Sequence, residues 1–456
     1  MTGHYERILI AIAMWACLGA ALFVLRRQSP LHLCVLAVLS TALVGAFYPV
    51  LTVFVEASSW RNVAQASESV VQGVQFEYLA FAAGMTLAVT GAWLLGWVPR
   101  GCSEIVERDD PRVRHRDTWV SILLLGLGGA LYAGYVAKVG MSALLNRDDY
   151  AEKYLLSQGL GPLAFGLNMM MAACLWAEAS RISSVLRWSF RGVAVAIAVW
   201  SIAMISVRTN VVILAIGYGW VLCRARRIEL KRVRPLLVAL LLVMYAAMEC
   251  FSLFRGASQE VGSARALELI GQYSSDSLSS VVGGSELSHP FLTTLEVSTY
   301  ELPGDLGGQS YLDAFPAYLP KAINPDAPKA LSERFVRTQY SDLDERGGGT
   351  AFSIVAEAWW NFGSIFGPLL VGIVAASVLL LVERIGARSP SSVVARLAPY
   401  CVYLVIIAHR SEFAVLFKQG VTIFLPALLL VYAVELAWMA RHAADSGRER
   451  TRLAPR

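Results

Sequence analysis

The sequence predicts an all-α polytopic membrane protein with one large extramembrane loop, and three observations lead to that fold class. The 456 residues are 56% hydrophobic and 16% charged, with a mean hydropathy of +0.54, whereas soluble proteins carry about a quarter charged residues. Apolar runs of roughly 20 residues recur along the chain, and this is the length that crosses a bilayer core about 30 Å thick. Residues 255–350 contain no such run.

About eleven apolar segments are expected to cross the membrane as helices. They are residues 8–25, 31–55, 78–98, 118–139, 160–179, 192–207, 211–223, 235–254, 351–382, 394–408 and 421–440. The chain then divides into eight crossings at 1–254, the large loop at 255–350, three crossings at 351–440 and a basic tail at 441–456. We predict that the short segments on either side of Arg208 form a hairpin, because a single crossing there would export the basic run at 100–116.

The basic residues fall mostly on one side of this arrangement. Most of the 39 Lys and Arg residues lie in alternate connections between the crossings. Since such positive connections stay in the cytoplasm, we expect the large loop and the N-terminus outside and the C-terminus inside. All seven cysteines lie in crossings or on the cytoplasmic side, and no CxxC or HExxH motif occurs. We therefore predict no disulfide framework in the loop, no metal site and no cofactor.

Arginines occur at the predicted outer ends of several crossings, namely Arg147, Arg208, Arg255 and Arg410. Ionisable groups at membrane depth are costly and therefore indicate function, and a guanidinium donates two parallel hydrogen bonds to a phosphate. We predict that these arginines converge on an anionic headgroup. The alternative is snorkelling, in which an arginine only marks where a helix leaves the lipid. A functional role is favoured most for Arg208, because this arginine lies in the shortest of the predicted outer connections, between residues 192–207 and 211–223.

The ninth apolar segment, residues 351–382, is too long for one crossing. As a single helix rising 1.5 Å per residue it would measure about 48 Å. Glycine and proline interrupt helices, so a break is predicted near residues 361–363 or at 367–368.

Before that break, Ser353, Glu357 and Asn361 recur at every fourth position and form one polar stripe. A broken helix can line a polar cavity at membrane depth, and Glu357 is the candidate general base. The alternative is an interfacial helix anchored by its tryptophans, with Glu357 facing water.

Secondary candidates at the same end are Arg337, Arg346, Asn361 and His409. Within the loop, residues 264–273 predict a short amphipathic helix, and residues 311–320 form an aromatic segment punctuated by prolines. Other loop carboxylates that could serve as a base are Asp276, Glu296, Glu301, Asp305 and Asp313.

Several short motifs carry a resemblance to a known family. They are residues 146–150 around Arg147, residues 206–210 around Arg208, residues 308–311 with 319–321, and residues 353–363, which end in Glu-Ala-Trp-Trp-Asn-Phe-Gly. With this set the chain resembles the oligosaccharide repeat unit polymerases, or O-antigen polymerases, of bacterial envelopes. The resemblance implies a multi-spanning, metal-independent class C glycosyltransferase in the bacterial inner membrane, with the loop in the periplasm.

The resemblance also implies the reaction and the partners. A growing glycan on undecaprenyl pyrophosphate would be transferred to an incoming lipid-linked repeat unit, building lipopolysaccharide O-antigen, capsule or exopolysaccharide. Glu357 and Arg208 would be catalytic, and the other outer arginines would hold the pyrophosphate. Partners would be membrane lipids, a chain-length regulator and a flippase, and no nucleic acid. The alternatives are an O-antigen ligase, for which His289 or His409 is available, and a lipid-linked oligosaccharide flippase or transporter.

Overall fold

A computed structural model describes most of the chain. The described residues are 2–25, 32–54, 66–98, 110–145, 156, 160–201, 209–224, 288–299, 306–319, 324–341 and 351–452. Every regular element in these ranges is a helix, as the sequence predicted.

Five of these helices are long and apolar enough to cross a membrane. They are His4–Val24, Leu33–Leu51, Pro111–Val139, Phe366–Arg388 and Phe413–Arg441. Two shorter apolar helices, Asn210–Cys223 and Val393–Ile407, fall on further predicted crossings. The predicted crossing at 235–254 and the predicted amphipathic helix at 264–273 lie outside the described residues.

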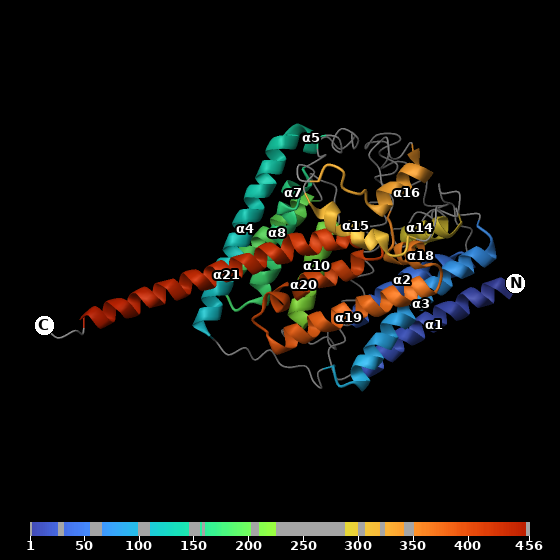
Figure 1. Cartoon of the computed structure of the whole chain (residues 1–456), viewed down its shortest axis with the longest axis horizontal. Coiled ribbons are helices and arrows are strands. Elements are labelled where there is room, and N and C mark those ends of the chain that lie inside the picture. Colours follow the sequence, from blue (N-terminus) through green and yellow to red (C-terminus); the bar gives the residue numbers. More distant parts are fainter. Residues whose placement is uncertain are drawn as a thin grey trace.

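One group of helices packs side by side around a common core (Figure 1). It contains α1 (Thr2–Val24), α2 (Leu33–Leu51), α3 (Glu68–Leu94) and α19 (Phe366–Arg388). Met14, Tyr78 and Met85 are fully buried in this core. Gly84 lets α3 touch α19, because an added Cβ would lie 2.2 Å from the carbonyl oxygen of Leu369.

A second group of helices surrounds a separate core. It contains α4 (Pro111–Val139), α8 (Gly166–Ala179), α9 (Ser184–Trp200), α10 (Thr209–Arg224), α20 (Val393–Ile407) and α21 (Phe413–Arg452). The short helices α5 (Met141–Leu145) and α7 (Gly161–Ala164) adjoin α4. Trp176 and Tyr400 are fully buried in the core of the group. Because α20 contacts α2 and α19 as well, it joins the two groups.

Local sequence signals set the helix limits in this group. Asp110 caps α4 by accepting a hydrogen bond from the amide of Arg112, and Pro111 occupies the first helical position. Ser183 caps α9 in the same way. Asn210 Nδ2 donates to Ser201 Oγ at 3.0 Å, so the end of α9 lies beside the start of α10.

The long ninth segment is broken at the first of the two predicted positions. It forms α18 (Ile354–Phe362) and α19, separated by Gly363 with a φ of +78° and Ile365 with a φ of +50°. Glycine adopts a positive φ readily, whereas a β-branched residue there is strained. The crossing therefore begins at Phe366, and α18 is a separate short helix.

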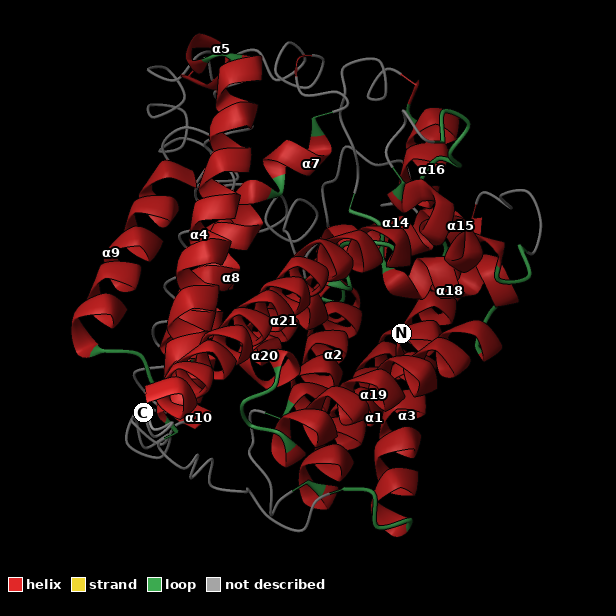
Figure 2. Cartoon of the chain, turned by 60° about the vertical axis from the view of Figure 1, so that its left-hand side comes forward, coloured by secondary structure: helices red, strands yellow, loops and turns green. Residues whose placement is uncertain are grey.

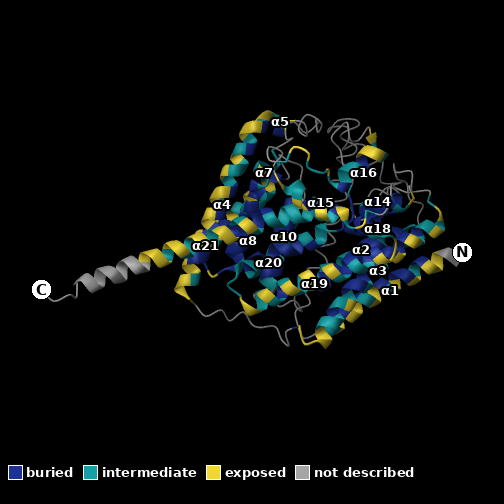
Figure 3. Cartoon of the chain, viewed as in Figure 1, coloured by how far each residue is buried: buried dark blue, intermediate teal, exposed yellow. Residues whose placement is uncertain are grey.

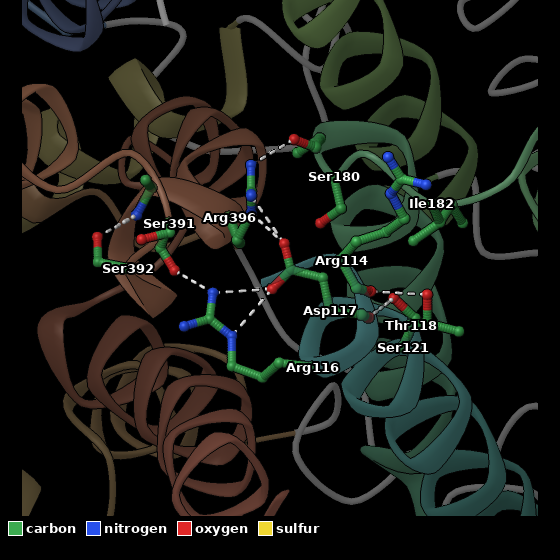
Figure 4. A network of polar contacts seen from close by, with 12 residues as sticks. Arg114, Arg116, Asp117, Thr118, Ser121, Ser180, Ile182, Ser391, Ser392 and Arg396 are labelled. Carbon is green, nitrogen blue, oxygen red and sulfur yellow. Dashed lines mark hydrogen bonds and ion pairs between the residues drawn. The ribbon is translucent and has the colours of Figure 1, made fainter. Parts of the chain in front are cut away.

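Several basic residues that the sequence places on the same side of the membrane lie together at one end of the bundle. At the basic end, Asp117 is fully buried between two arginines, 2.9 Å from Arg116 Nη2 and 2.7 Å from Arg396 Nη2 (Figure 4). Arg396 also donates to the carbonyl of Ala179 at 2.8 Å, and Arg116 to Glu435 at 3.1 Å. This network ties α4, α8, α20 and α21 together.

The described part of the large loop packs on the opposite end of the bundle (Figure 2). It supplies α14 (Ser288–Thr299), α15 (Gln309–Tyr318) and α16 (Leu331–Gln339). Helix α14 enters the first core, where Phe291 stacks on Tyr48 and Tyr78 with 5.6 Å between each pair of ring centroids. This part of the loop is therefore integrated with the membrane body.

Exposed residues, coloured yellow in Figure 3, lie on the outside of the bundle, and many of them are apolar. Leu428, Leu429 and Tyr432 on α21 are each more than half exposed, as are Val195 and Val199 on α9. An apolar exterior of this kind is what a bilayer-embedded helix presents to lipid tails. The exposed apolar exterior thus agrees with the membrane character that the composition predicted.

Candidate functional site

The centre of the candidate site is Glu357, on the short helix α18 beneath the docked loop. Ser353 caps this helix by accepting a hydrogen bond from the amide of Val355 at 3.0 Å. Ser353 in turn accepts from the hydroxyl of Tyr78 at 3.1 Å, which anchors α18 to α3. Glu357 lies one turn further on and is fully buried. The alternative prediction, a surface helix with Glu357 facing water, is therefore wrong.

Both oxygens of the Glu357 carboxylate accept hydrogen bonds. Ser310 Oγ donates to Oε1 at 2.7 Å, and the amide of Phe413 donates to Oε2 at 2.6 Å. Asn361 Nδ2 donates to Ser310 Oγ at 2.7 Å, and the amide of Ser310 donates back to Asn361 Oδ1 at 3.3 Å. We call Ser310, Glu357, Asn361 and the Phe413 amide the Glu357 network; it joins α15, α18 and the start of α21.

A glycine turn delivers Ser310 to this network. Gly307 and Gly308 have backbone φ values of +56° and +90°. Residues that carry a Cβ rarely adopt such positive φ values. The amide of Leu306 donates to the carbonyl of Trp360, and that of Gly307 to the carbonyl of Asn361. The turn therefore satisfies carbonyls at the end of α18, which have no partner within that helix.

Two buried carboxyl groups lie at this site. Burial and, to a smaller extent, the nearby Glu412 carboxylate raise the pKa of Glu357 to about 8, against hydrogen bonds from Phe413 and Ser310 that lower it. Burial also raises the pKa of Glu412, while Ser332 donates to it from its amide at 3.0 Å and from its hydroxyl at 2.6 Å. Carboxyl groups with pKa values near neutrality are typical of acid and base catalysts.

A pocket adjoins the network between α15, α16 and the start of α21. Its polar wall is formed by Ser310, Asp313, Lys329, Arg334 and Glu412. Its apolar wall is formed by Ala314, Ala317, Pro328, Ala330, Leu331 and Ala414. Its cavity volume is about 10 Å³, far below the roughly 300–1,000 Å³ of pockets that enclose a whole small ligand. It therefore has room for about one water-sized group, such as a single hydroxyl of a larger substrate.

The charged groups of the pocket are held in place by one another. Arg334 Nη2 lies 2.8 Å from Asp313 Oδ2, and Gln309 donates to Asp313 Oδ1 at 2.8 Å. Lys329 pairs with Glu333 at 3.2 Å. The pocket thus offers both donors and acceptors, as binding of a polyhydroxylated molecule requires.

Of the predicted site residues that the structure describes, some lie together at the candidate site and others lie away from it. Asn361 joins Glu357 in the network, and Asp313 lines the pocket. Arg410 is exposed on the turn between α20 and α21, two residues before Glu412, and Arg337 is exposed on α16. Arg147, Arg208, Arg255 and Arg346 lie outside the described residues, so the convergence of the arginines stays a prediction.

His409 is buried among helices of the bundle. It is 2% exposed, and Nε2 lies 3.1 Å from Thr41 Oγ1 on α2. Its ring lies 6.2 Å from that of Tyr78 and 5.9 Å from that of Phe81. The structure therefore places His409 in the helix core and not in the pocket, and His289 lies half-buried on α14.

Among the other predicted carboxylates, Glu296 is fully buried and accepts a hydrogen bond from the hydroxyl of Tyr340. Asp276, Glu301 and Asp305 lie outside the described residues. Within the described ranges, no three His, Cys, Asp or Glu side chains lie close enough to hold a metal ion.

Sequence reasoning missed Glu412, Ser332, Arg334 and Lys329 as members of the site. Their chain positions gave one usable signal: Glu412 follows the singled-out Arg410 by two residues at the end of a predicted crossing. No protein-family model, no curated protein and no solved structure matches this chain. Function therefore has to be inferred from the site itself.

Proposed function

We propose that this protein is an oligosaccharide repeat unit polymerase. In this proposal it is a glycosyltransferase of the bacterial inner membrane, with about eleven crossings and a class C architecture. It moves a growing glycan from undecaprenyl pyrophosphate onto an incoming lipid-linked repeat unit. The observation that carries the proposal is the position of the buried Glu357 network directly beside a charged pocket, at the end of the bundle where the large loop docks.

The pocket suits the acceptor sugar. An acceptor hydroxyl needs a base or precise positioning before it can attack an anomeric carbon. Glu357 and Glu412 supply buried carboxyl groups, and Asp313 with Arg334 supplies an acceptor and a donor for neighbouring hydroxyls. The cavity volume of about 10 Å³ has room for one hydroxyl group of the acceptor sugar.

The leaving group is a lipid pyrophosphate, which gains negative charge as the anomeric bond breaks. Guanidinium groups stabilise that charge more in the transition state than in the ground state, and this lowers the barrier. We assign this role to Arg208, with Arg147, Arg255 and Arg410 as further ligands of the pyrophosphate. Arg410 supports the assignment by lying on the same turn as Glu412.

The basic end of the bundle supports the proposed sidedness of the reaction. Three Arg–Trp pairs lie at that end, with each guanidinium 4.3 to 4.7 Å from the ring centroid. The pairs are Arg112 with Trp438, Arg191 with Trp188 and Arg384 with Trp97. Tryptophan gathers at membrane interfaces and arginine on the cytoplasmic side. This supports a cytoplasmic basic end and a periplasmic pocket.

Purified protein with lipid-linked repeat units as the only substrate tests the proposal. The expected product is a ladder of glycans that remain on the lipid carrier. A product that forms only after lipid A core is added would identify a ligase instead. An absence of glycan transfer by folded protein in both mixtures would contradict the proposed function.

A further inference from the structure

We infer that Ser310 contacts the acceptor sugar hydroxyl and relays its proton to Glu357. This inference rests on the proposed glycosyl transfer and names the group through which the buried carboxylate acts. Glu357 is fully buried and is not part of the pocket wall, whereas Ser310 is 7% exposed and lines the pocket. The hydrogen bond of 2.7 Å from Ser310 Oγ to Glu357 Oε1 connects the two.

The hydroxyl oxygen of Ser310 can accept one more hydrogen bond. A serine hydroxyl has one proton to donate and two lone pairs to accept with. The proton is directed to Glu357, and one lone pair accepts from Asn361 Nδ2 at 2.7 Å. Among the described residues the second lone pair has no donor. An acceptor hydroxyl in the pocket would supply it.

The surrounding contacts hold the relay in position. The amide of Ser310 donates to Asn361 Oδ1 at 3.3 Å, so the Asn361 side chain contacts Ser310 at both its backbone and its hydroxyl. Asn361 Nδ2 also donates to the carbonyl of Glu357 at 2.8 Å. On the other side, the Phe413 amide fixes the second carboxylate oxygen of Glu357. Such preorganisation is what proton transfer between fixed groups requires.

Asp313 is the competing base, because it also lines the pocket. However, its two oxygens are engaged by Arg334 at 2.8 Å and by Gln309 at 2.8 Å. Both oxygens of Asp313 are therefore already engaged by side-chain donors. Burial raises the pKa of Glu357 to about 8, so the ionised form, which becomes populated as the pH rises toward 8, is a strong proton acceptor.

The step balances without any further reactant. The acceptor O–H proton moves to Ser310 Oγ while the Ser310 proton moves to Glu357 Oε1. The acceptor oxygen forms a bond to the anomeric carbon, and the bond from that carbon to the pyrophosphate oxygen breaks. The electron pair of the broken bond leaves with the lipid pyrophosphate. Glu357 ends the step protonated, and the serine hydroxyl is regenerated.

Full-length protein in lipid nanodiscs, supplied with lipid-linked repeat units, tests the relay. The measurement is the initial rate of glycan transfer for the wild type and for Ser310→Ala, Ser310→Thr and Ser310→Cys. Loss of the relay is expected to slow Ser310→Ala by roughly 100-fold or more. Ser310→Thr keeps the hydroxyl and is expected to stay within about tenfold of the wild type. The matched control is Ser377→Ala on α19, where an exposed serine bonds only its own helix.

The outcomes separate the relay from a merely structural serine. Should Ser310→Ala unfold, Ser310→Cys provides the test, because a thiol is close in size and a weak hydrogen-bonding group; a rate at least about tenfold below wild type supports the relay. A folded Ser310→Ala or Ser310→Cys protein with a wild-type rate and pH profile overturns the relay alone. A wild-type protein that transfers no glycan overturns the relay together with the proposed function.

Discussion

Ser310 and Glu357 are 47 residues apart in the chain, yet the serine hydroxyl lies 2.7 Å from the carboxylate. Through this contact a loop helix reaches the short helix that precedes a membrane crossing. The second carboxyl oxygen accepts from the first residue of α21, so three elements meet at one buried carboxyl group. The site therefore depends on the folding of the loop onto the bundle, and changes in Glu357 affect stability as well as activity.

Glu357→Ala is expected to destabilise the protein more than Glu357→Gln. The alanine leaves the Ser310 hydroxyl and the Phe413 amide buried without an acceptor, and each unsatisfied group costs about 1–3 kcal/mol. Glutamine keeps one carbonyl acceptor. Thermal unfolding in detergent, followed by size-exclusion chromatography, measures the difference. Equal melting temperatures for the two variants would contradict the network.

Stability should fall as the pH rises, through Glu357. Its folded-state pKa of about 8 lies above the ordinary value of 4.5, so the folded protein binds this proton more tightly than the unfolded chain does. The stabilisation is complete below pH 4.5 and is lost as the pH rises through about 8. Melting temperatures between pH 6 and pH 9 should therefore fall more steeply for the wild type than for Glu357→Gln. Parallel slopes for the two proteins would argue against a buried, protonated Glu357.

The break before α19 and the polar stripe on α18 were predictable, because length and glycine content are local properties of the sequence. The alternating charges placed Arg116 and Arg396 at one end of the bundle, and both arginines do pair with Asp117; the side of the membrane on which that end lies stays a prediction. The partner of Glu357 was not predictable, since the loop has no apolar periodicity that would place Ser310 against α18. The burial of His409 was not predictable either. A polar residue at the end of a predicted crossing suggests exposure, whereas His409 packs against the rings of Tyr78 and Phe81 on α3.

Asp117→Asn should destabilise the basic end by about 3–5 kcal/mol, because it leaves two buried arginines without their shared counter-charge. The matched control is Glu435→Gln. Glu435 pairs with the same Arg116 but is 36% exposed, and exposed ion pairs contribute about 0–1 kcal/mol. Unfolding midpoints of both variants in nanodiscs provide the comparison. A control variant as unstable as Asp117→Asn would show that burial does not distinguish the two pairs.

Gly84→Ala should force α3 and α19 apart. The new Cβ would lie 2.2 Å from the carbonyl oxygen of Leu369, which belongs to the backbone and cannot rotate away. Overpacking of this kind costs about 1–3 kcal/mol. Gly91→Ala on the same helix meets no atom within 4 Å and should leave stability unchanged or slightly raised. The yield of monodisperse protein and the melting temperature measure both effects. Matching results for the two variants would contradict the close approach.

The glycan ladder of cells that lack the native copy and express Glu357→Gln or Arg208→Ala is the most direct measurement of polymerisation by this site. At wild-type protein levels, both variants should leave a single-repeat glycan and no long-chain ladder, because in the proposed reaction Glu357 accepts the proton and Arg208 binds the leaving pyrophosphate. A ladder of normal length from either variant would contradict the role assigned to that residue. Normal ladders from both would contradict the account of the reaction.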